Sequence, residues 1–181
     1  SASLPPIRYF EPRHLSNPAW AFARRPMPDG PLLDAIAAEA LATLRHFQAS
    51  DLGHLAWAYA RLVVLHQPLF AALAASSITT LRYFSPLHLS NTAWAFAKLL
   101  IEDRPLMHAI AAQSRATISD FGSTHISSIS WSLAPCVLRD GPLLDSISAA
   151  AIARLSDFEA QGLTNTAWAY STLEVPDRPL L

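Results

Sequence analysis

Five tryptophans at one constant spacing constrain the fold of this chain more than any other feature of its sequence. They recur every 37 residues without insertion or deletion, at Trp20, Trp57, Trp94, Trp131 and Trp168. A phenylalanine stands ten residues before each of them, at Phe10, Phe47, Phe84, Phe121 and Phe158. Self-similarity at a fixed period of about 20–50 residues is the signature of a repeat protein. The sequence therefore predicts one array of five units over residues 1–181, each unit centred on a tryptophan.

Each unit is predicted to contain two helices. The first begins at a proline that stands eleven residues after each tryptophan, and it runs, for example, from Pro31 to Phe47. Proline suits the first turn because its missing N–H would have no partner within the helix. A polar stretch of about four residues, such as 85–88, precedes a second helix from about Leu89 to Leu99. Both segments have helical periodicity and neither shows the alternation of a strand.

The second helix is predicted to be packed between neighbouring helices. Ala95 and Ala97 flank Trp94 and make the helix thin, so that another helix can approach closely. One 37-residue pair cannot bury both of its faces alone, so successive pairs must stack. We expect an all-α fold, a right-handed α-solenoid of about five 37-residue helix-turn-helix repeats that belongs to a longer array. In the fourth unit, Pro135 should end or kink the second helix.

Composition excludes several classes of protein. With 51% hydrophobic and 15% charged residues, the chain is too apolar to be disordered. Its 13 Lys and Arg residues against 14 Asp and Glu give a net charge of −1, so no global positive field indicates a nucleic-acid partner. The single cysteine, Cys136, permits no internal disulfide. No apolar run approaches the ~18 residues of a transmembrane segment, and residues 1–6 carry no targeting signal.

Three columns of polar residues are candidates for RNA binding. Asparagine can pair with a base edge and stands three residues before the tryptophan at Asn17, Asn91 and Asn165. A basic residue can neutralise a phosphate and stands four residues after the tryptophan at Arg24, Arg61 and Lys98. A second basic column contains Arg45 and Arg82 and becomes serine further along the chain. In a stacked array such columns would line a groove that meets about one base per repeat.

Charge favours the first half of the chain for this role. Residues 1–98 contain 8 basic and 5 acidic side chains, whereas residues 99–181 contain 5 basic and 9 acidic ones. RNA binding requires phosphate neutralisation along the groove, so the first half should contact RNA and the second half suits a protein partner. An alternative also fits these residues. The asparagines would then cap or bridge turns, and the basic residues would form a solvated edge.

The remaining conspicuous residues are predicted to be structural. The tryptophan and phenylalanine columns fit packing between repeats, although tryptophan can also stack on a base. The histidines fall in different units, which favours surface loops over a metal site. Cys136 stands in a column otherwise filled by leucine, which indicates a small buried side chain. We therefore expect no catalytic residues, no metal, no cofactor and no small-molecule substrate, and thus not an enzyme.

The second helix resembles a known family of repeats. The stretch Leu89-Ser-Asn-Thr-Ala-Trp-Ala-Phe-Ala-Lys-Leu99 and its copy over 163–173 are similar to octotricopeptide and heptatricopeptide repeats. Proteins of this kind, associated with RAP domains, occur in algal, dinoflagellate and apicomplexan organelles. The resemblance implies RNA binding in a chloroplast or mitochondrion.

Two functions follow from these observations. The first is a non-catalytic organellar helical-repeat protein that binds single-stranded or ribosomal RNA along a groove. The second is a structural scaffold or peripheral subunit of a large organellar complex, such as a ribosome or photosynthetic assembly, which acts through protein–protein contacts. The partners are accordingly RNA or the protein subunits of a larger assembly.

Overall fold

The computed structural model describes residues 12–24 and 30–173, apart from the side chains at positions 14, 18, 20, 22 and 24. The described residues form α-helices joined by short 3-10 turns and contain no strand, so the all-α prediction is confirmed. The α-helices are α1 (Pro12–Arg24), α2 (Gly30–Thr43), α3 (Ala49–Arg61), α4 (Gln67–Thr80), α5 (Pro86–Lys98), α6 (Arg104–Ala116), α7 (Ser123–Leu133), α8 (Gly141–Ala153) and α9 (Ala160–Thr172). The 3-10 turns are η2 (Leu44–His46), η3 (Leu81–Tyr83), η4 (Ile118–Asp120) and η5 (Leu155–Asp157). None of the described helices is long and apolar enough to cross a membrane.

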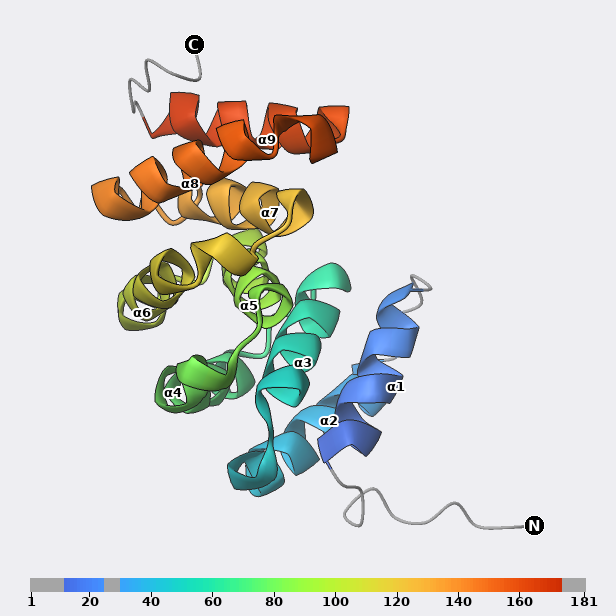
Figure 1. The fold of residues 1–181 in the computed structure, drawn as a ribbon. Helices are drawn as coiled ribbons and strands as arrows, with labels where there is room; N and C mark the ends of the chain where they lie inside the picture. The colour runs from blue at the N-terminus through green and yellow to red at the C-terminus, as the bar shows by residue number, and fades with distance from the viewer. Residues whose placement is uncertain (1–11, 25–29, 174–181) are drawn as a thin grey trace, which may run out of the picture.

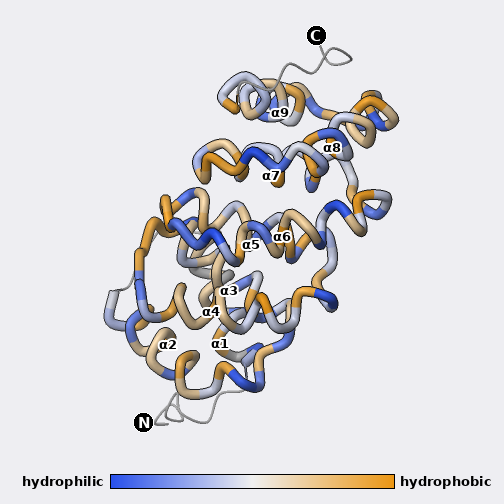
Figure 2. The backbone as a smooth tube through the Cα atoms, turned by 90° about the vertical axis from the view of Figure 1, so that its left-hand side faces the viewer, coloured by the Kyte–Doolittle hydropathy of each residue, from blue (hydrophilic) through white to orange (hydrophobic). Residues whose placement is uncertain are grey.

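The helices form two rows (Figure 1). The odd-numbered helices α1, α3, α5, α7 and α9 pack one against the next, and these are the most extensive contacts in the structure. The even-numbered helices α2, α4, α6 and α8 form the second row. Figure 2 shows the pairs following one another from the N-terminal to the C-terminal end. Equivalent residues of successive units therefore lie side by side along each row.

The predicted helix boundaries were wrong at two places. The first helix of a unit does not continue to its phenylalanine, because α4 gives way to the turn η3 and Phe84 is extended. The second helix begins at Pro86, three residues before the predicted start at Leu89. Ser85 is its N-cap and Pro86 its first residue, a position that proline favours. Residues 86–88 are therefore the first turn of α5 and not part of a polar loop.

The helices α3, α5 and α7 end in the same way. Val63, Leu100 and Val137 have positive φ values of 57°, 54° and 49°, in the left-handed region that residues other than glycine, and above all β-branched ones such as valine, rarely adopt. The next N–H in each turn donates back into the helix, as from Val64 to the Tyr59 carbonyl at 2.9 Å. This is the Schellman arrangement, in which the left-handed residue is usually glycine. Here it leaves an apolar side chain largely exposed at the same place in each unit.

Pro135 shortens the second helix of the fourth unit, as the sequence predicts. α7 ends at Leu133, two residues before the position that corresponds to the end of α5 at Lys98. The loss has a simple cause, since proline has no backbone N–H to donate within a helix. The Schellman turn at Val137 nevertheless has the same hydrogen bond as its neighbours, from the Leu138 N–H to the Leu133 carbonyl at 3.0 Å.

The core is continuous along the two rows of helices. Phe47, Phe84 and Phe121 are buried, whereas Phe158 is half-buried. Tyr59 donates its hydroxyl hydrogen to the carbonyl of Leu33 on the preceding helix at 2.5 Å. Its copy Tyr170 bonds to Leu144 in the same way at 2.5 Å.

Two buried serines in one column should be destabilising. The hydroxyls of Ser77 and Ser114 are buried without a hydrogen-bond partner, while the equivalent residues of other units are Ala40 and Ala151. An unpaired buried hydroxyl costs about 1–3 kcal/mol. We expect Ser77→Ala and Ser114→Ala each to raise the free energy of unfolding by about 1 kcal/mol in urea titrations.

A third serine provides the control for this prediction. Ser130 also replaces an alanine of its column, but its buried hydroxyl donates to the Ile126 carbonyl at 2.7 Å. Ser130→Ala should therefore give no comparable gain. Equal gains for all three substitutions would show that helix propensity, and not the missing hydrogen bond, determines the effect.

Candidate nucleic-acid interface

The tryptophans form a ladder along the odd-numbered helices. Successive ring centroids of Trp57, Trp94, Trp131 and Trp168 are 6.4, 6.4 and 6.3 Å apart, and we call these four residues the tryptophan ladder. The first three are half-buried, and Trp168 is 45% exposed. The side chain of Trp20 lies outside the described part of the chain. Because Trp94 and Trp131 are half-buried and each has an indole neighbour on both sides, these two rings join adjacent units and offer little surface for a base.

The asparagine and basic columns flank the ladder. On α5, Asn91, Trp94 and Lys98 are three and four residues apart, a spacing that places all three on one stripe of the helix. Asn91 is half-buried and Lys98 is exposed. The candidates on the other odd-numbered helices are an exposed Asn17, an exposed Arg61 and a half-buried Asn165. The predicted role of the Arg24 side chain falls outside the described part of the structure.

The second basic column lies at the opposite edge of the odd-numbered row. Arg45 is in η2 and Arg82 is in η3, the turns that lead into α3 and α5. Arg61 and Lys98 lie at the far ends of the same two helices. A 13-residue helix is roughly 20 Å long, so the structure does not bring the two basic columns together.

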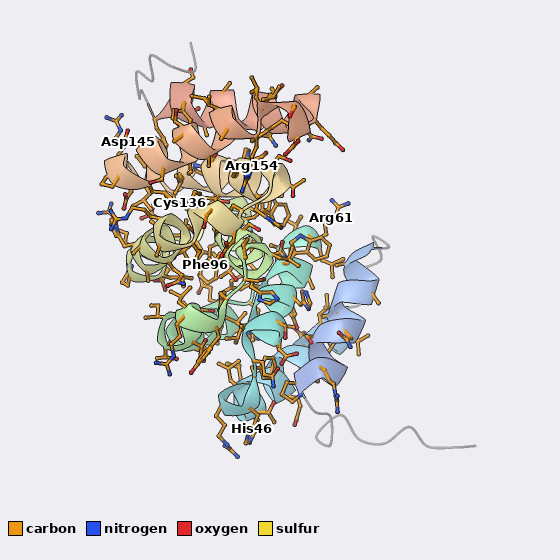
Figure 3. The ribbon with its side chains drawn as sticks, viewed as in Figure 1. His46, Arg61, Phe96, Cys136, Asp145 and Arg154 are labelled. Atoms are coloured by element: carbon orange, nitrogen blue, oxygen red, sulfur yellow. The ribbon has the colours of Figure 1, made fainter. Side chains whose placement is uncertain are left out.

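Aromatic residues accompany this second column, and the sequence analysis missed them. The Arg82 guanidinium lies 4.7 Å from the centroid of the Tyr83 ring, and Tyr83 is 65% exposed. One unit earlier, Arg45 donates from Nε to Nε2 of the adjacent His46 at 3.1 Å. Figure 3 shows His46 at the lower end of the structure. The sequence contains a signal for this feature. The last two residues of the 3-10 turn are Arg-His in η2 and Arg-Tyr in η3, but Ser-Asp in both η4 and η5.

Two equivalent hollows lie at the edge where the odd-numbered helices begin. One, of about 480 Å³, lies between the starts of α3 and α5 and is lined by residues that include Gln48, Tyr83 and His88. The other, of about 230 Å³, lies two units further on, and Asp157 and Gly162 take the places of Tyr83 and His88. The first hollow thus contains Tyr83 and His88, whereas the second contains the acidic Asp157 and Glu159 beside Phe158.

His88 and His125 are not loop residues, which corrects the expectation from the sequence. Both are half-buried in the first turn of a helix. Their Nδ1 atoms accept hydrogen bonds from the backbone N–H of Ser85 at 3.3 Å and of Gly122 at 3.2 Å. Burial lowers the pKa of both imidazoles, and His54, whose ring centroid is 5.9 Å away, lowers the pKa of His88 further. The neutral rings therefore cap helices and carry their proton on Nε2.

The other chemically reactive side chains are dispersed. Among the described residues, no three His, Cys, Asp or Glu side chains gather as a metal site would require. Burial, together with the charge of Glu102, raises the pKa of the Cys136 thiol to about 11. The thiol is half-buried and protonated near neutral pH, a state that favours a structural role.

The fold and the candidate surface define a class of protein. Its members consist of stacked helix pairs and have an aromatic ladder, with cations concentrated in the N-terminal half. A comparison with family models shows which family within this class the chain matches. The model of the RNA-editing substrate-binding complex 6 protein matches residues 8–181, and the chain belongs to this family. No curated protein matches the chain. The resemblance to octotricopeptide and heptatricopeptide repeats stays a prediction, because the family that matches is a different one.

Proposed function

We propose that this chain is a non-catalytic RNA-associated subunit of a mitochondrial RNA-editing complex and binds single-stranded RNA with its N-terminal half. The family description supports both RNA and protein partners. RNA-editing complexes of kinetoplastids are mitochondrial, which favours the mitochondrion and gives no support to the chloroplast or the photosynthetic assembly.

The distribution of exposed cations carries the RNA proposal. In the first half, Arg45, Arg61, Arg82 and Lys98 are all exposed. The corresponding positions in the second half are Ser119, Pro135, Ser156 and Thr172. Since RNA affinity depends on phosphate neutralisation, the RNA path lies over α3 and α5 and their turns, and it ends before α7.

The proposed architecture is the right-handed α-solenoid, whose single array provides a long surface without a catalytic centre. Successive odd-numbered helices that pack side by side support it. The non-catalytic role is supported by the neutral histidines that cap helices and by the protonated thiol of Cys136.

A scaffold role in the same complex is the second candidate, and the Schellman turns favour it. Val63, Leu100 and Val137 are exposed in register along one edge, and Leu65 is exposed beside them. A hollow of about 330 Å³ lies at this edge, with Leu65, Phe70 and Leu100 in its lining. Contiguous exposed apolar side chains mark protein-binding surfaces.

The RNA proposal predicts a specific salt dependence. We expect the chain to bind a randomised single-stranded RNA pool, with an affinity that falls between about 50 and 200 mM salt. The double variant Arg61→Ala/Lys98→Ala should bind more weakly and reduce the slope of log affinity against log salt by about 1.4, since each contact to a single strand contributes about 0.7. Filter binding at several salt concentrations measures the slope.

The matched control removes two cations from the second half of the chain. Arg104 and Arg115 are exposed on α6, so Arg104→Ala/Arg115→Ala changes the net charge equally and should leave the slope unchanged. An equal loss in both double variants would indicate a diffuse charge effect and contradict the proposed path. Failure of the unmodified chain to bind RNA at low salt would overturn the RNA proposal in favour of the scaffold.

A further inference from the structure

We propose that the hollow between η2 and η3, at the starts of α3 and α5, is a nucleobase pocket in which one base of a single-stranded RNA stacks on Tyr83. This inference rests on the proposed RNA function and specifies the residues and the chemical group that are recognised. It concerns the edge of the molecule opposite Arg61 and Lys98, about one helix length away from them.

The aromatic surface is the first element of the pocket. Tyr83 is 65% exposed although it stands in an ordered turn, and the Arg82 guanidinium lies 4.7 Å from its ring centroid. A cation over one face leaves the opposite face of the ring for another planar group. Stacking on an exposed aromatic ring is the usual way in which proteins hold an unpaired base.

The shape and polarity of the hollow suit a base. Its volume of about 480 Å³ lies within the range of about 300–1,000 Å³ that is common for small-ligand sites. Buried Phe47 contributes an apolar surface to the lining, and Gln48 and Ser50 contribute polar groups. His88 also lines the hollow, and because its Nδ1 accepts the Ser85 N–H, its Nε2 carries a hydrogen. Amide, hydroxyl and imidazole groups can together meet the donors and acceptors of a base edge.

The exposed cations at this edge suit the phosphates on either side of the base. Arg82 adjoins the proposed stacking surface, and Arg45 stands at the equivalent place one unit earlier. A strand that follows the turns η2 and η3 would meet one guanidinium in each of them. This repeating arrangement fits a polymer with a regularly spaced negative charge better than it fits an isolated nucleotide.

The equivalent hollow two units further on lacks counterparts of Arg82, Tyr83 and His88 and serves as an internal comparison. Ser156 and Asp157 replace Arg82 and Tyr83, and Gly162 replaces His88. Glu159 adds a further acidic group to the lining. This hollow would repel a phosphate, and the ring in its lining is the half-buried Phe158 instead of an exposed tyrosine, so the proposal concerns one position in the array and not every unit.

The test compares two RNA probes on the full chain. One is a short single-stranded oligonucleotide, and the other is the same strand with its bases removed. We expect Tyr83→Ala to weaken binding of the first probe by about tenfold without changing its salt slope, as loss of one stacked base would do. Binding of the abasic strand should be unaffected, and Tyr83→Phe should retain the affinity of the unmodified chain.

The chain itself suggests a variant that preserves the turn. Arg82→Ser/Tyr83→Asp introduces the pair that η4 and η5 already contain, so the fold should persist, as circular dichroism would verify. This variant should lose affinity for the intact strand and also reduce the salt slope. Asp157→Ala at the acidic hollow should leave affinity for both probes unchanged.

The outcomes separate this inference from the function on which it rests. Normal binding by Tyr83→Ala, with weaker binding by Arg61→Ala/Lys98→Ala, would overturn the base pocket and leave the RNA function standing. Equal losses on intact and abasic strands would also overturn it, because Tyr83 would then act without contacting a base. No binding by the unmodified chain would overturn both.

Discussion

Replacing Trp94 with alanine should lower the free energy of unfolding by about 3 kcal/mol, the largest effect that we expect for a single residue outside the buried core. Trp94 lies in the middle of the tryptophan ladder, with ring neighbours at 6.4 Å on both sides. Its removal takes away the half-buried indole and two aromatic contacts, each of which contributes about 0.5–1.5 kcal/mol beyond the buried area. Urea unfolding followed by far-UV circular dichroism measures the loss without relying on tryptophan fluorescence.

Trp168 is the matched control because it has a tryptophan neighbour in the ladder on one side only, whereas Trp94 has one on each side. It is 45% exposed, and its one partner within the ladder is Trp131 at 6.3 Å. We expect Trp168→Ala to cost about 1 kcal/mol, one aromatic contact and a smaller loss of buried surface. If the two variants lose the same stability, the stacking of units through the ladder does not determine the effect.

Acidification should destabilise the protein as the pH falls below about 6.5, the ordinary pKa of histidine. His88 and His125 each accept a backbone N–H through Nδ1 at the start of a helix. Protonation converts Nδ1 into a donor, breaks the cap and places a positive charge at the positive end of the helix dipole. A lost N-terminal cap costs on the order of 1 kcal/mol per helix. Unfolding midpoints in urea, measured from pH 7.5 to pH 5, report the effect.

The direction follows from the lowered pKa values of these groups. Burial lowers the pKa of both histidines, so the unfolded chain binds protons more readily than the folded chain. The stability they contribute is therefore complete above the unfolded pKa and is lost as the pH falls through the lower folded pKa. A protein that became more stable at pH 5 would contradict the capping role.

Another unit of the chain suggests a substitution that isolates the contribution of His125 to the pH dependence. Asp51 stands in the same column as His125, and its carboxylate accepts the Gln48 N–H at 3.0 Å. His125→Asp should keep the cap and reduce the loss of stability between pH 7.5 and pH 5, because a carboxylate stays ionised over this range. His108 is exposed on α6, so His108→Gln should leave the pH dependence unchanged.

The helix pairs could be predicted from the sequence because the repeated columns report packing. Trp94 and Ala95 recur in a register that only a helix between similar helices can satisfy, and the all-α structure agrees. The helix starts were misplaced because Pro86 was interpreted as part of a loop, although proline also suits the first helical position. The Schellman turns could not be foreseen, since Val63 and Val137 adopt a conformation that local preference opposes.

The candidate site was predictable in its residues but not in its geometry. The 37-residue spacing identified Arg45, Arg61, Arg82 and Lys98 as candidates. It could not show that the first basic column and the second lie at opposite ends of α3 and α5. Tyr83 was overlooked because its column is not uniform: the equivalent residues are Tyr9, His46, Asp120 and Asp157. Spacing reveals the residues that every unit shares, whereas this proposed pocket depends on a residue that only some units contain.

The ladder also restricts how a chain of this kind can change in length during evolution. Insertion of one residue within an odd-numbered helix would rotate everything after it by about 100° and turn the next indole away from its neighbours. Gain or loss of a whole 37-residue unit, by contrast, preserves the contact between the rings on either side of the join. Viable length variants should therefore arise by duplication or deletion of entire units, while single-residue insertions are confined to the turns between helices.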